Sequence, residues 1–330
     1  MAEQIMHNIY RIEIPLPNNP LQTINSYIIK DKERTLVIDT GMNMEECKTA
    51  MLAGLEDIGV NLEEVDFFIT HMHADHCGLV ASLIKTRLPI IYCSLSAATE
   101  IAGLSKPEYW DKAKSIGHLI GFPDEELHCA INKHPGHKYS PRGQMSFSIY
   151  KDRDTFSAGG YDFTCIETPG HTAGHMCLYE TEKKLLFSGD HILADITPNI
   201  SLGLSYEKDL LAQYLKNLDR ISMFDIDLVL PGHRNLSTDC KTRIHEIKNH
   251  HQLRADEVLS ILGYGSQNAY QIASRMTWDM NYESWEQFPA AQKWFASGEA
   301  IAHLKYLEEK KLVFKEVREE VYYYSLSQRN

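Results

Sequence analysis

Thr70-His71-Met72-His73-Ala74-Asp75-His76 places four potential metal ligands within six residues, directly after the apolar run 65–69. The apolar run predicts a strand, and the ligands follow at its end. Imidazole nitrogens suit zinc and the other late first-row divalent metals. A carboxylate directly before a histidine lets one short loop serve two neighbouring ions. The spacing therefore predicts a metal site with two ions.

Three further apolar runs repeat this design, because each ends at a glycine and then presents one potential ligand. The ligands that they present are His171, Asp190 and His233. In a layered α/β fold, side chains at the carboxyl ends of strands converge on one crevice. We therefore expect four strand ends to build a single site.

These residues, in this order, resemble the metallo-β-lactamase superfamily, and within it the glyoxalase II-like hydrolases. The resemblance covers about residues 5–245 and includes the motifs at 37–41, 168–175 and 188–191. Together these motifs are specific, whereas any one alone is weak. All seven ligand positions of the family are filled, and none holds the cysteine that replaces a ligand in the true lactamases. The seven are His71, His73, Asp75, His76, His171, Asp190 and His233.

The resemblance implies an α/β fold, an αββα four-layer sandwich in which two mixed sheets pack face to face with helices outside. It implies that His71, His73 and His171 hold one metal, that Asp75, His76 and His233 hold the second, and that Asp190 bridges them. A water between the metals is the expected nucleophile. We expect Asp75 to have a second, catalytic role, because it can orient the hydroxide formed from that water.

Three more side chains adjoin the ligand motifs. Asp39 either caps a turn or, as in the family, accepts a hydrogen bond from the ligand loop, and we expect the second role. His175 and His191 are expected to be hydrogen-bond partners and not ligands. Further along, Thr197 and Asn199 lie in the loop that follows the bridging aspartate. They are candidate substrate contacts, although turn chemistry around the proline between them explains both residues equally well.

Length, charge and composition narrow the class of protein. At 330 residues the chain fits a catalytic domain and an appendage. No apolar run approaches the roughly 20 residues needed to span a bilayer. The first residues lack the basic and apolar regions of a secretory signal, which favours a cytoplasmic location. Seven cysteines show no CxxC spacing and are expected to be reduced.

Two departures from a minimal sandwich are expected. Residues 1–248 form the catalytic domain, and a helical insertion at about 95–150 either covers the site as a lid or forms a dimer contact. Residues 249–330 suggest three helices and a hairpin, which resembles a winged helix. The three helices are expected at 255–262, 269–278 and 290–310. From 251 to 330 there are nine Lys and Arg against eleven Asp and Glu, so nucleic-acid binding is not favoured. We expect the tail to be a scaffold, to complete the pocket or to mediate homodimerisation.

The leading hypothesis is a hydrolase with two divalent metal ions that cleaves a small ester, thioester or lactone. Zinc is the expected metal, and iron and manganese are alternatives. A phosphodiesterase or endoribonuclease with the same metal site is the second hypothesis, because the ligands cannot separate the two chemistries. A metal-stabilised winged-helix binding or regulatory module is the third, although seven retained ligands favour catalysis. The expected partner is a small-molecule substrate, and no membrane is implied.

Overall fold

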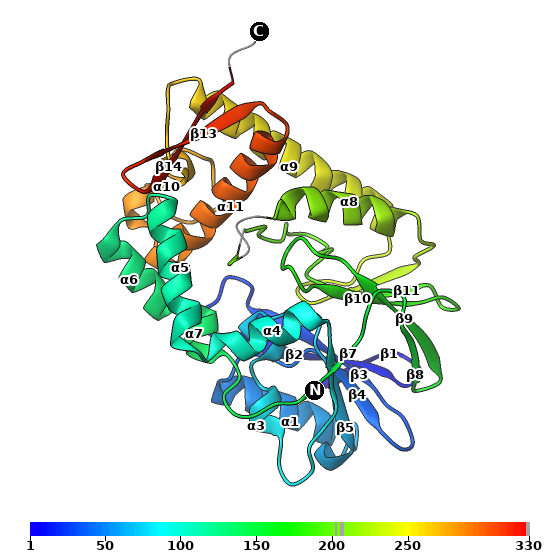
Figure 1. Ribbon diagram of the computed structural model, residues 1–330. Coiled ribbons are helices and arrows are strands. Elements are labelled where there is room, and N and C mark those ends of the chain that lie inside the picture. Colours follow the sequence, from blue (N-terminus) through cyan, green and yellow to red (C-terminus); the bar gives the residue numbers. More distant parts are fainter. Residues whose placement is uncertain (202, 205–207, 328–330) are drawn as a thin grey trace.

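Two β-sheets face each other in the computed structural model, which describes residues 1–201, 203–204 and 208–327, and helices cover their outer sides (Figure 1). The first sheet follows the chain order and is antiparallel up to its fourth strand and parallel from there on. Its strands are β1 (Ala2–Met6), β2 (Ile9–Pro15), β3 (Thr23–Ile29), β4 (Thr35–Ile38), β5 (Val65–Phe68), β6 (Ile91–Cys93) and β7 (Phe147–Ile149).

The second sheet has the order β12-β11-β10-β9-β8 and contains one parallel pair, β11 with β12. Its strands are β8 (Thr155–Ala158), β9 (Tyr161–Glu167), β10 (Met176–Glu180), β11 (Leu185–Gly189) and β12 (Leu228–Pro231). Both sheets are therefore mixed, and the predicted four-layer sandwich is confirmed.

Aromatic side chains fill the space between the two sheets. Tyr27 from the first sheet meets Phe187 from the second edge to face, with ring centroids 5.3 Å apart, and Phe163 packs on the same ring at 5.8 Å. All three are almost fully buried in one apolar cluster to which both sheets contribute. Burial of this apolar surface holds the sheets together.

The outer faces of the sheets carry their own helices. On the first sheet, α1 (Glu45–Asp57) buries Cys47, Met51 and Leu55 in the core. On the second sheet, α8 (Leu210–Ser222) and α9 (Cys240–Leu262) close a separate apolar cluster. Short helices η1 (Leu62–Glu64), α2 (Ala74–Cys77) and α3 (Val80–Leu83) follow α1 along the chain.

The predicted insertion contains four helices, but its end is part of the sandwich. The helices are α4 (Leu95–Leu104), α5 (Pro107–Leu119), α6 (Asp124–Lys133) and α7 (Pro135–Tyr139). The next element, β7, pairs with β6 and extends the first sheet. The helical part therefore ends about ten residues before residue 150, because the chain must return to the sheet before it crosses to β8.

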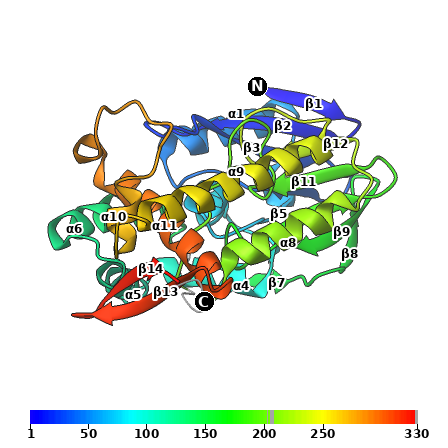
Figure 2. The same cartoon turned by 90° about the horizontal axis from the view of Figure 1, so that it is seen from above.

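The tail comprises the end of α9, α10 (Ala269–Ala273), η2 (Trp285–Gln287), α11 (Ala290–Glu309) and the hairpin of β13 (Val313–Arg318) and β14 (Val321–Leu326). Its first helix begins much earlier than the expected residue 255, because Asp239 caps it with a hydrogen bond from the backbone N–H of Thr242 (3.1 Å). Figure 2 shows α9 running from the sandwich into the tail. The division at residue 248 falls within this helix and stays a prediction.

The tail rests on the insertion. Helix α11 packs against α6, where Lys293 and Glu126 form an ion pair at 2.8 Å. The Tyr270 hydroxyl donates to the same glutamate at 2.9 Å, and the Tyr270 ring packs edge to face on Phe122. Figure 1 shows α5 and α6 beside α10 and α11. Insertion and tail therefore form one helical layer beside the sandwich.

All seven cysteines are unpaired, as the sequence predicts. Six of them are buried, and only Cys129, on α6, is partly exposed. Burial raises the pKa of Cys77 well above its ordinary value, so the thiol beside the ligand loop stays protonated. None of the helices in the described ranges is long and apolar enough to cross a membrane.

Replacing Phe187 with alanine should lower the free energy of unfolding by about 3–5 kcal/mol, because it opens a cavity between the sheets. Urea unfolding followed by tryptophan fluorescence measures the change. Phe314, which is 46% exposed, provides the matched control, and its replacement by alanine should change stability by less than about 0.5 kcal/mol. Equal losses in the two variants would contradict the assignment of the inter-sheet core.

Candidate metal centre

The seven side chains that the sequence singles out as ligands meet at one edge of the sandwich. They come from the ends of four strands: the loop and short helix α2 after β5, and the positions just past β9, β11 and β12. They form two groups, and in each the potential ligand atoms lie within 4.8 Å of one another. The groups are His71, His73, His171 and Asp190, and Asp75, His76 and His233.

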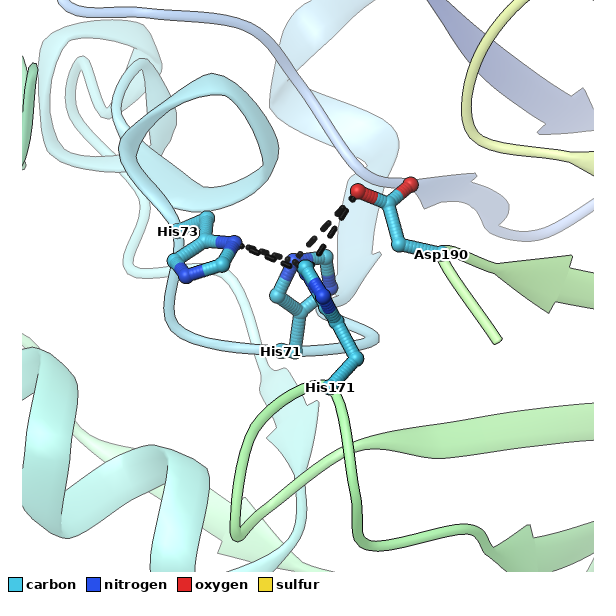
Figure 3. Close-up of side chains that lie close together, drawn as sticks. All are labelled: His71, His73, His171 and Asp190. Atoms are coloured by element: carbon cyan, nitrogen blue, oxygen red, sulfur yellow. Dashed lines mark hydrogen bonds and ion pairs between the residues drawn. The ribbon is translucent and has the colours of Figure 1, made fainter. Parts of the chain in front are cut away.

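In the first group, three ring nitrogens point at a common centre (Figure 3). Nδ1 of His73 lies 3.0 Å from Nε2 of His71 and 2.9 Å from Nε2 of His171, and the two Nε2 atoms are 3.2 Å apart. A tetrahedral zinc ion with Zn–N bonds of about 2.0–2.1 Å would separate its nitrogens by about 3.3–3.4 Å. The observed separations are close to these values, so the group fits one such ion.

Hydrogen bonds on the far side of two rings establish which nitrogen carries the lone pair. Nδ1 of His171 lies 2.8 Å from the carbonyl oxygen of Asn199, which can only accept, so Nδ1 carries the proton. Nδ1 of His71 lies 3.0 Å from the Thr70 hydroxyl, which itself donates to Asp39. Both Nε2 atoms are therefore unprotonated, and such neighbouring lone pairs repel unless a cation lies between them.

Two buried polar atoms of the second group, and one oxygen of Asp190 that faces them, form no hydrogen bond. They are Nε2 of His76, Nε2 of His233 and Oδ1 of Asp190. The Nδ1 atom of each of these two rings makes a hydrogen bond: that of His76 lies 2.7 Å from Asp39, and that of His233 lies 2.7 Å from the carbonyl oxygen of Thr23. Buried polar atoms are rarely left without a partner. Because the two Nε2 atoms lie within 3.7 Å of Oδ1 of Asp190, the three atoms fit a second ion.

Asp190 lies between the two groups and turns one carboxylate oxygen toward each. Its Oδ2 is 3.5 Å from Nε2 of His171, and its Oδ1 is 3.4 Å from Nε2 of His76 and 3.7 Å from Nε2 of His233. A Cβ atom at Gly232 would lie 2.7 Å from that Oδ1 atom, so the close approach requires a glycine. This placement allows a bridging role.

Asp39 connects the end of β4 to the ligand loop. Its Oδ1 accepts from the backbone N–H of Thr70 at 2.9 Å, and its Oδ2 accepts from the Thr70 hydroxyl and from His76, each at 2.7 Å. Its backbone adopts a φ of +58°, which is unfavourable for an aspartate and is stabilised here by these contacts. Asp39 therefore orients the ligand loop from behind.

The two other histidines beside the motifs lie outside both groups. His175 is buried, pairs through Nδ1 with the Thr168 hydroxyl at 2.8 Å, and accepts through Nε2 from the backbone N–H of Asp190 at 3.1 Å. It thus supports the backbone of the central aspartate. His191 packs edge to face on the ring of Tyr214, whose hydroxyl donates to the His191 carbonyl oxygen at 2.8 Å.

Of the two candidate substrate contacts, Asn199 makes contacts that sequence reasoning did not foresee. Its carbonyl oxygen holds His171, and its amide group donates to the carbonyl oxygen of Phe295 and to the carboxylate of Glu299, each at 3.3 Å. Thr197 is partly buried in the same segment. Contact of either residue with a substrate stays a prediction.

The pKa values of the histidines are shifted in opposite directions in the two groups. In the first, burial lowers the pKa of His71 well below its ordinary value and that of His73 to about 3, so these imidazoles are neutral. In the second, burial opposes the charged form of His76, but Asp190 and Asp39 outweigh it and raise the pKa of His76 well above its ordinary value. The first group is thus ready to bind a cation, whereas the second holds protons.

The other members of the second group follow the same logic. Burial lowers the pKa of His233, but Asp190 and Asp75 raise it by more. Burial raises the pKa of Asp75, but the hydrogen bond with His233 and the charge of His76 lower it overall. Burial likewise raises the pKa of Asp190, but the charges of His233 and His76 lower it by more, to well below its ordinary value. Both carboxylates of the centre therefore stay ionised, and their charge favours cations.

Two solved protein structures have a fold similar to that of this chain. A solved metallo-beta-lactamase family protein from Thermus thermophilus is 23% identical, with a TM-score of 0.82 over 98% of this chain and all of its own. A beta-lactamase domain protein from Burkholderia ambifaria is 22% identical, with a TM-score of 0.79 over 99% of this chain and 95% of its own. These likenesses show the fold.

Sequence comparison points the same way. The Bacillus subtilis (strain 168) protein named "Probable metallo-hydrolase YqjP" is 23% identical over 312 residues, which are 91% of this chain and 92% of that protein. The family model described as "Metallo-beta-lactamase superfamily" matches residues 20–233, a stretch that includes every member of both ligand groups. The chain belongs to the metallo-beta-lactamase superfamily.

Proposed function

We propose that the protein is a binuclear metal-dependent hydrolase that cleaves a small ester, thioester or lactone, with zinc as the metal. The observation that carries this proposal is the position of Asp190, which turns one oxygen toward each ligand group. A site for a single structural ion would not need a second, separately oriented set of buried ligands. The catalytic role is further supported by the retention of all seven ligands.

In this proposal His71, His73 and His171 would hold one ion and Asp75, His76 and His233 would hold the other, while the carboxylate of Asp190 faces both groups. When bound, two divalent ions supply a nucleophile at neutral pH, polarise the carbonyl oxygen and stabilise the leaving group. Asp75 is the catalytic residue that we assign. Its carboxylate stays ionised and can accept a hydrogen bond from the attacking water, which orients the lone pair toward the carbonyl carbon.

The histidine and aspartate ligand set, without cysteine, supports placement in the glyoxalase II-like branch. The order of α9, α10, α11 and the β13–β14 hairpin supports a winged-helix-like tail. The tail has a net negative charge, and α11 packs on α6 of the insertion. Both features favour a scaffold that completes the catalytic domain over a nucleic-acid-binding module.

The zinc-loaded protein should hydrolyse p-nitrophenyl acetate, an acyl thioester or a lactone in preference to bis-p-nitrophenyl phosphate. Replacing Asp190 with alanine should lower kcat/KM at least about 100-fold, because removing even an outer partner of a metal ligand costs about 10- to 100-fold. Asp195, an exposed aspartate five residues later, is the matched control, and its replacement by alanine should leave activity unchanged.

Preference for the phosphodiester would replace the proposed reaction with phosphoryl chemistry at the same site. Two bound metal ions without turnover of any of these substrates would contradict the proposed substrate class and favour a binding or regulatory role.

Acidification should release the ion held by Asp75, His76 and His233 first. The pKa values of His76 and His233 are raised, so protons compete with the metal there already near neutral pH. The pKa values of His71 and His73 are lowered, so protons do not compete with the metal for the first group until the solution is strongly acidic. Metal content after dialysis at a series of pH values should fall from two ions to one before it falls to none. Simultaneous loss of both ions would contradict this order.

A further inference from the structure

The orientation of the ligand His171 depends on one backbone carbonyl group. Nδ1 of His171 donates to the Asn199 oxygen at 2.8 Å, and this bond turns Nε2 toward His71 and His73. A partner on the far nitrogen fixes both the tautomer and the ring angle of a metal-binding histidine. Movement of the Asn199 peptide would therefore rotate the ring away from the centre.

The tail holds this peptide in place. The side-chain amide of Asn199 donates to the Phe295 carbonyl oxygen and to Oε2 of Glu299, each at 3.3 Å, and both acceptors lie on α11. Helix α9 holds the chain between Asp190 and Asn199 at earlier positions. There Arg243 donates to the carbonyl oxygens of Leu193 at 2.7 Å and Ile196 at 2.9 Å. The segment between Asp190 and Asn199 is thus fixed by helices that begin after the family match ends at residue 233.

Glu299 is itself held by a buried cation. Only 8% of the residue is exposed, and its second oxygen, Oε1, accepts from Nε of Arg254 at 3.1 Å. Arg254 in turn donates to Glu257 and to the carbonyl oxygen of Thr277, each at 2.6 Å, and its guanidinium lies 4.3 Å from the centre of the Trp278 ring. A buried carboxylate with a fixed cationic partner keeps a defined orientation, because breaking the pair leaves an uncompensated charge.

We propose that Glu299 and Arg254 are positioning residues of the metal centre, which act on His171 through Asn199. The two oxygens of Glu299 accept different hydrogen bonds: Oε1 accepts from Arg254, which fixes the carboxylate, and Oε2 accepts from the Asn199 amide. The tail is then a necessary part of the site and not an independent module. This inference rests on the proposed metal centre but not on the proposed substrate.

The rate of metal loss to a chelator tests the proposal without any substrate. Zinc-loaded full-length protein is mixed with an excess of a chromogenic chelator at neutral pH. Replacing Glu299 with alanine should release zinc at least about tenfold faster, the lower end of the effect of removing such an outer partner. Asn199→Ala should do the same, because it keeps the carbonyl group that holds His171 but removes the amide that ties it to the tail.

A double-mutant cycle separates positioning from a general loosening of the tail. If Glu299 acts through Asn199, the double variant should release zinc no faster than Asn199→Ala alone. Glu126→Gln is the matched control, because it weakens another ion pair of α11, the partly exposed pair with Lys293, that leads to no metal ligand. This control should release zinc at the wild-type rate even if its Tm falls.

Three outcomes would overturn the proposal. The first is release of zinc from Asn199→Ala at the wild-type rate, and the second is release from the double variant at a rate raised by the product of the two single effects. The third is release from Glu126→Gln as fast as from Glu299→Ala. Asn199→Ala leaves the Glu299–Arg254 pair intact, so it decides the question even if Glu299→Ala does not fold. Wild-type protein that holds no metal would overturn both this inference and the metal centre. Wild-type protein that holds metal but hydrolyses nothing would reject only the proposed reaction.

Discussion

The centre depends on the position of one carboxylate between two sets of imidazole nitrogens. Asp190 reaches that position because β11 ends at Gly189 and pairs in parallel with β12, which brings Gly232 directly alongside it. His175 receives the backbone N–H of Asp190, so the carboxylate is fixed from behind as well. Neither glycine has room for a side chain, since a Cβ atom at either position would lie 2.7 Å from an atom of the centre or of His175. The sandwich thus places two sheet ends so that a single side chain can serve both ligand groups.

The helices outside the sandwich have a different relation to this site. The strand ends supply the ligands, whereas α9 and α11 hold the segment from Leu193 to Asn199. Helix α11 contacts both α6 and the segment that carries Asn199, so it connects the insertion with the metal centre. Under the proposed positioning of His171 by Glu299, the tail belongs to the catalytic unit of this metallo-beta-lactamase superfamily member.

Short-range patterns predicted which side chains meet at the centre, and the resemblance that these motifs carry implied the sandwich. Each candidate ligand follows an apolar strand within a few residues, and the order of the motifs carries the resemblance to the family. The edge strand β1 was missed because its residues are half exposed and show no alternation of apolar and polar side chains. The start of α9 was placed too late, since the stretch from Lys241 to Gln252 is rich in lysine and histidine. The contact between Glu299 and Asn199 joins positions 100 residues apart, and no local pattern encodes such a pairing.

The distribution of thiols has a practical consequence for following this molecule in solution. Burial raises the pKa of Cys47 and Cys240 to about 11, and Cys93, Cys165 and Cys177 have values of about 12. Together with the buried Cys77, these groups are poor nucleophiles at neutral pH. Cys129 alone is partly exposed, and it lies on the helix that α11 contacts. The natural sequence thus offers a single attachment point for a maleimide fluorophore, at the junction where movement between insertion and tail would change the emission.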